Sequence, residues 1–173
     1  ARLIGVDRIA THAGFIPENM DDPLYVSLVS ALKDVASYCK ANGQYFCFET
    51  GQETPVTLLR TIQDIGYDNV GINLDPANLV MYGKGNAIDS LKVLGKYLLG
   101  VHIKDGKYPT NGRELGIEVP IGKGDVDMPR LLEKIRELGY EEPLTIEIEL
   151  DRREGEESPE SAISYAVEYL NSH

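Results

Sequence analysis

The chain has 173 residues, of which 42% are hydrophobic, and carries a formal net charge of −11 at pH 7. This length suits one globular domain, residues 1–173, and the acidic balance disfavours a nucleic-acid partner, because phosphate binding needs clustered Lys and Arg. No run approaches the roughly 18 apolar residues of a membrane span, so we expect a cytoplasmic protein with no membrane partner.

Five apolar runs with alternating side chains predict β-strands. They cover residues 6–11, 45–50, 70–75, 99–104 and 144–150. The gaps between them carry helical patterns that begin at Asp, Thr or Ser, often followed by Pro, and that end at Gly. The predicted helices span residues 22–43, 54–66, 86–97 and 127–139, and a last one begins at Ser158.

Strands that alternate with helices indicate right-handed βαβ units and a parallel sheet, either doubly wound or closed as a barrel. Alternate side chains of a strand point to opposite faces of the sheet. One face is apolar in every predicted strand, and the other is small or polar. A doubly wound sheet needs two apolar faces, whereas a barrel accepts polar side chains at the carboxyl ends of its strands. We therefore predict a (β/α) TIM barrel.

The number of predicted units is smaller than a closed barrel requires. A barrel of this class has eight βα units and typically about 250 residues, whereas five units are predicted here. The sequence also begins with residues typical of the end of a helix that leads into a strand. We expect that about three N-terminal units are missing and that the chain is the C-terminal part of a TIM barrel. The alternative is a genuine five-stranded domain with exposed sheet edges.

Four side chains lie at or near the carboxyl ends of separate predicted strands, and all have inward parity. They are Glu49, Asp75, His102 and Glu147. Three carboxylates that converge with an imidazole repel one another unless a cation holds them, so the pattern predicts a divalent metal site. Their oxygen and nitrogen atoms suit Mn²⁺, Mg²⁺ or Co²⁺ better than a thiolate-bound zinc.

Each of these residues also has a purely structural interpretation. Asp75 fits a turn cap, His102 a hydrogen-bonded barrel histidine, and Glu49 an ion pair with a basic residue. Glu147 competes with Glu149, which has the same parity two residues later. The Gly-rich and charged segment 105–125 follows the fourth strand, and we expect it to cover the mouth of the barrel as a lid.

Short motifs along the chain resemble the xylose-isomerase-like TIM barrels, a family of sugar and sugar-phosphate isomerases and epimerases. The matching segments are THAG, FET, NLDPANL, GVHIKD, GKGDVD and GYEEPLTIEIE. The resemblance implies an eight-unit barrel with a metal ion held by Glu49, Asp75, His102 and Glu147. It also implies that Glu49 and Glu147 act as the acid/base pair, and that the remaining motif residues lie near the substrate. These substrate-binding candidates are His12, Asn78 and Lys104.

We therefore predict a divalent-metal-dependent isomerase or epimerase that moves a proton next to a carbonyl through an enediolate. Its partner would be a small sugar or sugar phosphate. Mn²⁺ is the preferred metal, and Mg²⁺, Co²⁺ and Zn²⁺ are the alternatives. Both a monomer and a homo-oligomer are compatible with the sequence. One alternative is a metal-dependent hydrolase or abasic-site nuclease of the same fold. Asn78, at a motif position that often holds His in the family, weakens that alternative. Another is an inactive barrel fragment that serves as a binding module.

Overall fold

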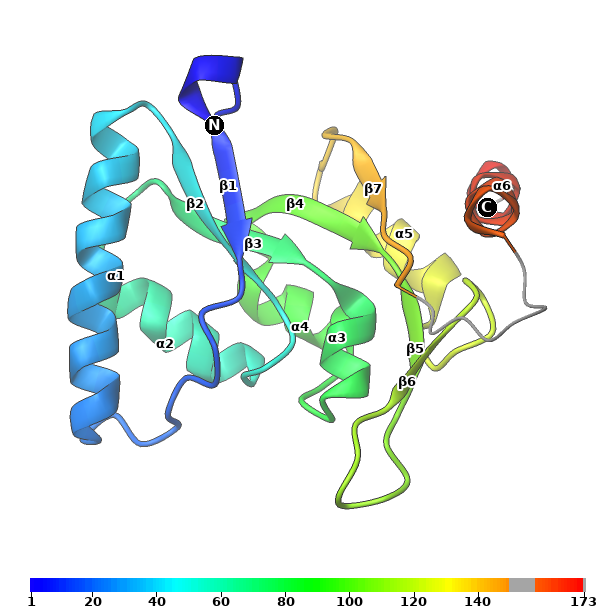
Figure 1. Ribbon diagram of the computed structural model, residues 1–173, viewed down its shortest axis with the longest axis horizontal. Helices are drawn as coiled ribbons and strands as arrows, with labels where there is room; N and C mark the ends of the chain where they lie inside the picture. The colour runs from blue at the N-terminus through cyan, green and yellow to red at the C-terminus, as the bar shows by residue number, and fades with distance from the viewer. Residues whose placement is uncertain (150–157, 173) are drawn as a thin grey trace.

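The structure is a computed structural model that describes residues 1–149 and 158–172. Five parallel strands form one curved sheet in chain order, which makes about half of a barrel (Figure 1). The strands are β1 (Arg8–Thr11), β2 (Tyr45–Glu49), β3 (Val70–Leu74), β4 (Leu98–Ile103) and β7 (Leu144–Ile146). The predicted α/β barrel architecture is confirmed in this partial form.

All five predicted helices are present. They are α1 (Pro23–Ala41), α2 (Pro55–Ile65), α4 (Ala87–Leu94), α5 (Met128–Glu137) and α6 (Pro159–Asn171). The residue before each helix accepts a hydrogen bond from a backbone N–H in the first turn, as Asp22 does from Leu24, which explains why the start signals were readable. No helix within the described residues has both the length and the apolar character that crossing a membrane requires.

Four features differ from the sequence predictions. A short helix, α3 (Pro76–Met81), follows β3 directly, and a 3-10 turn (Arg2–Ile4) precedes β1. The predicted lid segment contains an antiparallel hairpin of β5 (Asp105–Lys107) and β6 (Ile117–Val119). The last strand ends at Ile146 rather than at residue 150, which itself lies outside the described residues.

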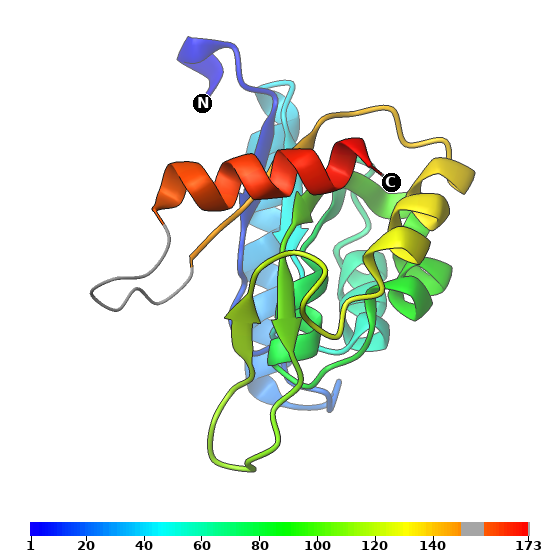
Figure 2. The ribbon, with the colours of Figure 1, turned by 90° about the vertical axis from the view of Figure 1, so that its right-hand side faces the viewer.

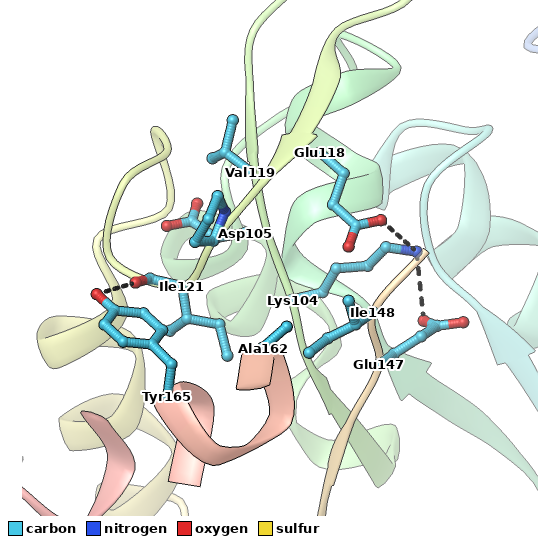
Figure 3. A pocket seen from close by; sticks show the side chains of 10 residues that line it. Lys104, Asp105, Glu118, Val119, Ile121, Glu147, Ile148, Ala162 and Tyr165 are labelled. Atoms are coloured by element: carbon cyan, nitrogen blue, oxygen red, sulfur yellow. Dashed lines mark hydrogen bonds and ion pairs between the residues drawn. The ribbon is translucent and has the colours of Figure 1, made fainter. Parts of the chain in front are cut away.

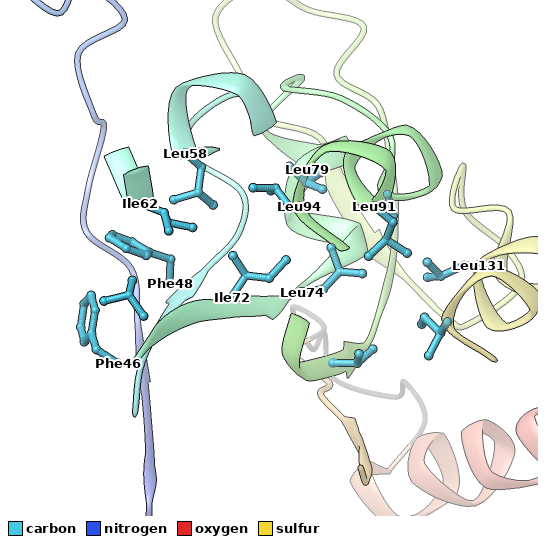
Figure 4. Packing of buried hydrophobic residues seen from close by; sticks show 14 of the residues in the cluster. Phe46, Phe48, Leu58, Ile62, Ile72, Leu74, Leu79, Leu91, Leu94 and Leu131 are labelled. Atoms are coloured by element: carbon cyan, nitrogen blue, oxygen red, sulfur yellow. The ribbon is translucent and has the colours of Figure 1, made fainter. Parts of the chain in front are cut away.

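The hydrophobic core lies between the outer face of the sheet and the helices (Figure 4). The outward-facing side chains of β2, β3 and β4 are buried there, as the alternation predicts. They are Phe46, Phe48, Val70, Ile72, Leu74, Val101 and Ile103. Each buried Leu, Ile or Phe contributes roughly 1.5–3 kcal/mol to folding. This packing leaves the inner face of the sheet free for polar side chains.

Arg8 crosses the inner face of the half-barrel at the end opposite the strand carboxyl ends. Its Nη1 donates a 2.8 Å hydrogen bond to the carbonyl oxygen of Leu99, and its Nη2 lies 2.9 Å from Glu142 Oε1. One side chain thus joins β1 to β4 and to the segment before β7. Arg8 therefore helps to hold the curvature of the sheet.

Asp105 fixes the hairpin and the following loop to the end of β4. Its buried carboxylate accepts hydrogen bonds from the backbone N–H groups of Gly106, Gly122, Gly124 and Val126 at 2.8–3.1 Å. Helix α6 also contacts this loop, because the Tyr165 hydroxyl donates to the carbonyl oxygen of Ile121. Figure 2 shows α6 crossing in front of the strands, with the hairpin projecting below it.

We expect Asp105→Ala to lower the free energy of unfolding by about 2–3 kcal/mol, because it leaves several buried N–H groups without an acceptor. Urea denaturation measures this change. Asp34→Ala, on the exposed face of α1, is the control and is expected to change stability by less than about 0.5 kcal/mol. Equal stability of the two variants would contradict the role of Asp105.

Candidate metal centre

Parallel pairing brings the four predicted ligand residues to one edge of the sheet. Glu49 ends β2, His102 lies next to the last residue of β4, and Asp75 and Glu147 directly follow β3 and β7. One ligand atom from each of the four side chains lies within 4.8 Å of the other three. The structure therefore brings together the whole set that the sequence predicts.

Asp75 serves as a helix cap and also faces this cluster. Its Oδ1 accepts a 2.8 Å hydrogen bond from the backbone N–H of Asn78 and caps α3. Thr50 holds the backbone of Asp75 through two hydrogen bonds of 2.9 and 3.0 Å. The side chain is fully buried, yet Oδ2 has no hydrogen-bond partner. The turn-cap interpretation therefore accounts for one oxygen of Asp75 and leaves the other available as a ligand.

Three ligand atoms of the cluster are buried without a hydrogen bond: Asp75 Oδ2, His102 Nδ1 and Glu147 Oε2. His102 Nδ1 lies 2.7 Å from Glu147 Oε2 but does not have the geometry of a hydrogen bond to it. It lies 3.5 Å from Glu49 Oε1 and 3.7 Å from Asp75 Oδ2. Buried polar groups are normally hydrogen-bonded, so convergent atoms that lack a hydrogen bond are suited to hold a cation. The residues present fit a divalent metal ion.

The electrostatics of the cluster favour positive charge. Although burial disfavours the charged imidazole, the surrounding carboxylates, with Asp75 and Glu49 foremost, raise the pKa of His102 to about 10. The imidazole in turn lowers the pKa of Glu49, whereas burial raises the pKa of Glu147. A metal ion competes with the proton on His102, because a ligating imidazole must be neutral.

Lys104 is buried, with 2% of its surface exposed. Figure 3 shows its amino group next to Glu147, one residue of the cluster. Its Nζ is 2.6 Å from Glu149 Oε2, 3.5 Å from Glu147 Oε2 and 3.9 Å from Asp75 Oδ2. Burial alone would lower the pKa of Lys104, but Glu149 and Asp75 raise it above its usual value. The side chain is therefore an ion-paired counter-charge, and its contact with substrate stays a prediction.

The positions of Glu147 and Glu149 differ, although their parity is the same. Glu147 contributes an oxygen to the cluster, whereas the side chain of Glu149 is 68% exposed and pairs with Lys104. The geometry thus favours Glu147 over Glu149 as a ligand.

The other two substrate-binding candidates lie next to the cluster. His12 Nε2 is 3.6 Å from Glu49 Oε1, and the His12 side chain is about one-third exposed. Asn78 is buried in the first turn of α3 and packs against Gly51, where a Cβ would overlap the Asn78 side chain. Their contacts with a substrate stay predictions.

One residue of this region, Glu118, is not predicted from the sequence. Glu118, in β6, is only 11% exposed, and its carboxylate lies 3.9 Å from Lys104 Nζ. It also accepts a hydrogen bond from the backbone N–H of Glu149, at 2.9 and 3.1 Å to its two oxygens. A single acidic residue in a segment expected to be a loop gives no signal of such contacts.

A protein-family model described as Xylose isomerase-like TIM barrel matches residues 1–173. The chain belongs to the xylose isomerase-like TIM barrel family. Within this family it is similar to a xylose isomerase domain protein from Planctomyces limnophilus, with 36% identity and a TM-score of 0.90 over 99% of this chain and 59% of that one. An uncharacterized protein from Methanocaldococcus jannaschii, MJ1311, is 27% identical over 152 residues, which are 80% of this chain.

A solved structure of L-ribulose 3-epimerase shares the xylose isomerase-like fold, with 18% identity and a TM-score of 0.75 over 99% of this chain and 62% of that one. The chain spans about half the length of MJ1311, the curated relative that it matches. Family membership and the sheet of five parallel strands together show a partial barrel of the xylose isomerase-like type.

Proposed function

We propose that the chain is part of a divalent-metal-dependent sugar or sugar-phosphate epimerase or isomerase. In this proposal residues 1–173 form one domain that supplies the last five βα units of the barrel. The observation that supports it best is the convergence of four ligand atoms within 4.8 Å, three of them buried without a hydrogen bond. The likeness in fold to L-ribulose 3-epimerase agrees with the sugar chemistry.

The metal would be held by Glu49, Asp75, His102 and Glu147. Three carboxylates with one imidazole suit Mn²⁺ best among the candidates, ahead of Mg²⁺, Co²⁺ and Zn²⁺. A bound divalent cation supplies positive charge next to a carbonyl oxygen, which makes the neighbouring C–H group more acidic.

The two glutamates carry the proton transfer in this proposal. One carboxylate removes the proton next to the carbonyl, which gives a planar enediolate of the sugar. Return of a proton by the other carboxylate to the opposite face gives an epimer, and transfer between adjacent carbons gives an aldose/ketose isomer. His12, Asn78 and Lys104 would contact the substrate hydroxyl or phosphate groups around this pair.

The test is a panel of D-fructose, D-tagatose, D-ribulose and L-ribulose, with their phosphates, incubated in D₂O with and without Mn²⁺. We expect manganese-dependent deuterium incorporation at the carbon next to the carbonyl in at least one sugar. A parallel assay uses DNA that carries an abasic site. Cleavage of that DNA without exchange in any sugar would overturn the proposal in favour of the nuclease alternative.

The two neighbouring glutamates give a further prediction. We expect Glu147→Gln to weaken Mn²⁺ binding at least about tenfold, because the amide replaces a ligand oxygen. Glu149→Gln is expected to have a smaller effect, because its side chain is largely exposed and pairs with Lys104. Isothermal titration with Mn²⁺ measures both. Equal losses would show that both glutamates bind the metal.

A further inference from the structure

The β5–β6 hairpin reaches the candidate metal centre through Glu118. This residue lies far from Glu147 in the sequence, yet Figure 3 shows both side chains meeting the amino group of Lys104. The contacts of Glu118 thus link a hairpin outside the main sheet to the edge of the sheet where Glu147 lies.

The backbone around Glu147 has little support from the sheet. β7 ends at Ile146, and the N–H of Glu147 donates a 3.2 Å hydrogen bond to the carbonyl oxygen of Ile103 in β4. Two residues later, the N–H of Glu149 donates to the side-chain carboxylate of Glu118 instead of to a backbone carbonyl of the main sheet. The backbone here is therefore anchored at two points: β4 holds the N–H of Glu147 itself, and the hairpin holds the N–H of Glu149.

Lys104 adds a charged contact between the same groups. Its Nζ lies 3.9 Å from Glu118, 3.5 Å from Glu147 and 2.6 Å from Glu149. Because Lys104 is buried, these carboxylates restrict where its amino group lies, and the amino group in turn restricts Glu147. Hydrogen bonds to charged groups are stronger than neutral ones, so the Glu118 carboxylate is an effective anchor.

We propose that Glu118 is a positioning residue that holds Glu147 in the geometry needed to bind the metal, a role that rests on the proposed function. It acts by accepting the Glu149 N–H and by its charged contact with Lys104, and it does not touch the ion. Partners that orient metal ligands typically change metal affinity by about 10- to 100-fold when they are removed.

Titration of the full chain with Mn²⁺ tests this role. We expect Glu118→Ala to weaken Mn²⁺ binding about tenfold or more, and Glu118→Gln to retain most of the affinity, because the amide oxygen still accepts the Glu149 N–H. Glu114→Ala removes the same charge from an exposed position of the same hairpin and is the matched control, expected to bind like the wild type. The visible absorption of bound Co²⁺ is expected to change in Glu118→Ala and to stay unchanged in Glu114→Ala.

The outcomes separate this role from the proposed function. A wild-type chain that binds no Mn²⁺ would overturn the metal site itself. If the wild type binds Mn²⁺ and Glu118→Ala binds it with equal affinity, the role of Glu118 is overturned and the metal site stands. Equal losses of affinity in Glu118→Ala and Glu118→Gln would also overturn the role of Glu118. If the Ala variant does not fold, Glu118→Asp replaces it, and its shortened side chain is expected to weaken binding by the same mechanism.

Discussion

Asp75→Asn is expected to abolish measurable binding of Mn²⁺ while α3 remains folded. The amide oxygen can still accept the N–H of Asn78, so the cap survives. The amide nitrogen replaces Oδ2, the buried atom that faces the cluster without a hydrogen-bond partner. A donor in that place cannot bind a cation, and the loss should exceed the roughly 10- to 100-fold that removal of an outer partner of a ligand costs. Isothermal titration measures the affinity, and far-ultraviolet circular dichroism reports the helix content.

Asp22→Asn is the matched control for this experiment. Asp22 caps α1 through its Oδ1, as Asp75 caps α3, but it lies outside the four-residue cluster. We expect this variant to bind Mn²⁺ like the wild type. If Asp75→Asn also retained wild-type affinity, Asp75 would be only a helix cap.

The second large effect is expected at the two glutamates of the cluster. Glu49→Gln and Glu147→Gln each remove a carboxylate that exchanges protons, and general acid/base groups typically contribute about 10²- to 10⁴-fold to the rate. We expect a loss of that size in deuterium incorporation from D₂O into a reactive ketose, as measured by proton NMR in the presence of Mn²⁺.

Glu133→Gln, on the exposed face of α5, is the control for the effect of the substitution itself. Its exchange rate is expected to equal that of the wild type. Retained deuterium incorporation in both Glu49→Gln and Glu147→Gln would exclude the acid/base pair. Melting temperatures near that of the wild type in both variants would show that any loss of exchange does not come from unfolding.

The partial barrel can be predicted from the sequence because two independent patterns agree. One is the alternation of apolar side chains along the strands, and the other is the cap residues at the helix ends. Outward-facing residues such as Phe48 and Ile72 are apolar because helices cover them. The resulting alternation of apolar residues identifies the strands in the sequence. Cap residues such as Thr54 and the Gly66 that follows α2 in a left-handed conformation marked the helix ends. Both signals are local and therefore readable without the fold.

The missed elements lack such local signals. Helix α3 has only six residues, too few to show a helical period, and its start coincides with the Asp75 motif. The strands β5 and β6 have three residues each, and the segment Asp105–Lys107 contains no β-branched residue. The hairpin is stabilised by long-range contacts, such as those of Asp105 with the later loop, which a sequence pattern does not reveal.

The choice between Glu147 and Glu149 depends on where the last strand ends. A strand that continued to residue 150 would point both side chains to the same face, because the period of a strand is two residues. Since β7 ends at Ile146, Glu149 does not have to follow the direction of Glu147, and its largely exposed side chain pairs with Lys104. The contact of Glu118 also depends on where β7 ends, and the sequence therefore does not predict it. Glu118 accepts the backbone N–H of Glu149, which lies beyond the end of β7 and outside the sheet.

In the proposed function, four side chains at the carboxyl ends of separate strands bind one cation. Anomalous diffraction from crystals of the chain soaked in Mn²⁺ tests it most directly. We expect one anomalous peak in direct contact with ligand atoms of Glu49, Asp75, His102 and Glu147. A cluster without a peak at saturating Mn²⁺, or with the ion bound elsewhere, would contradict it.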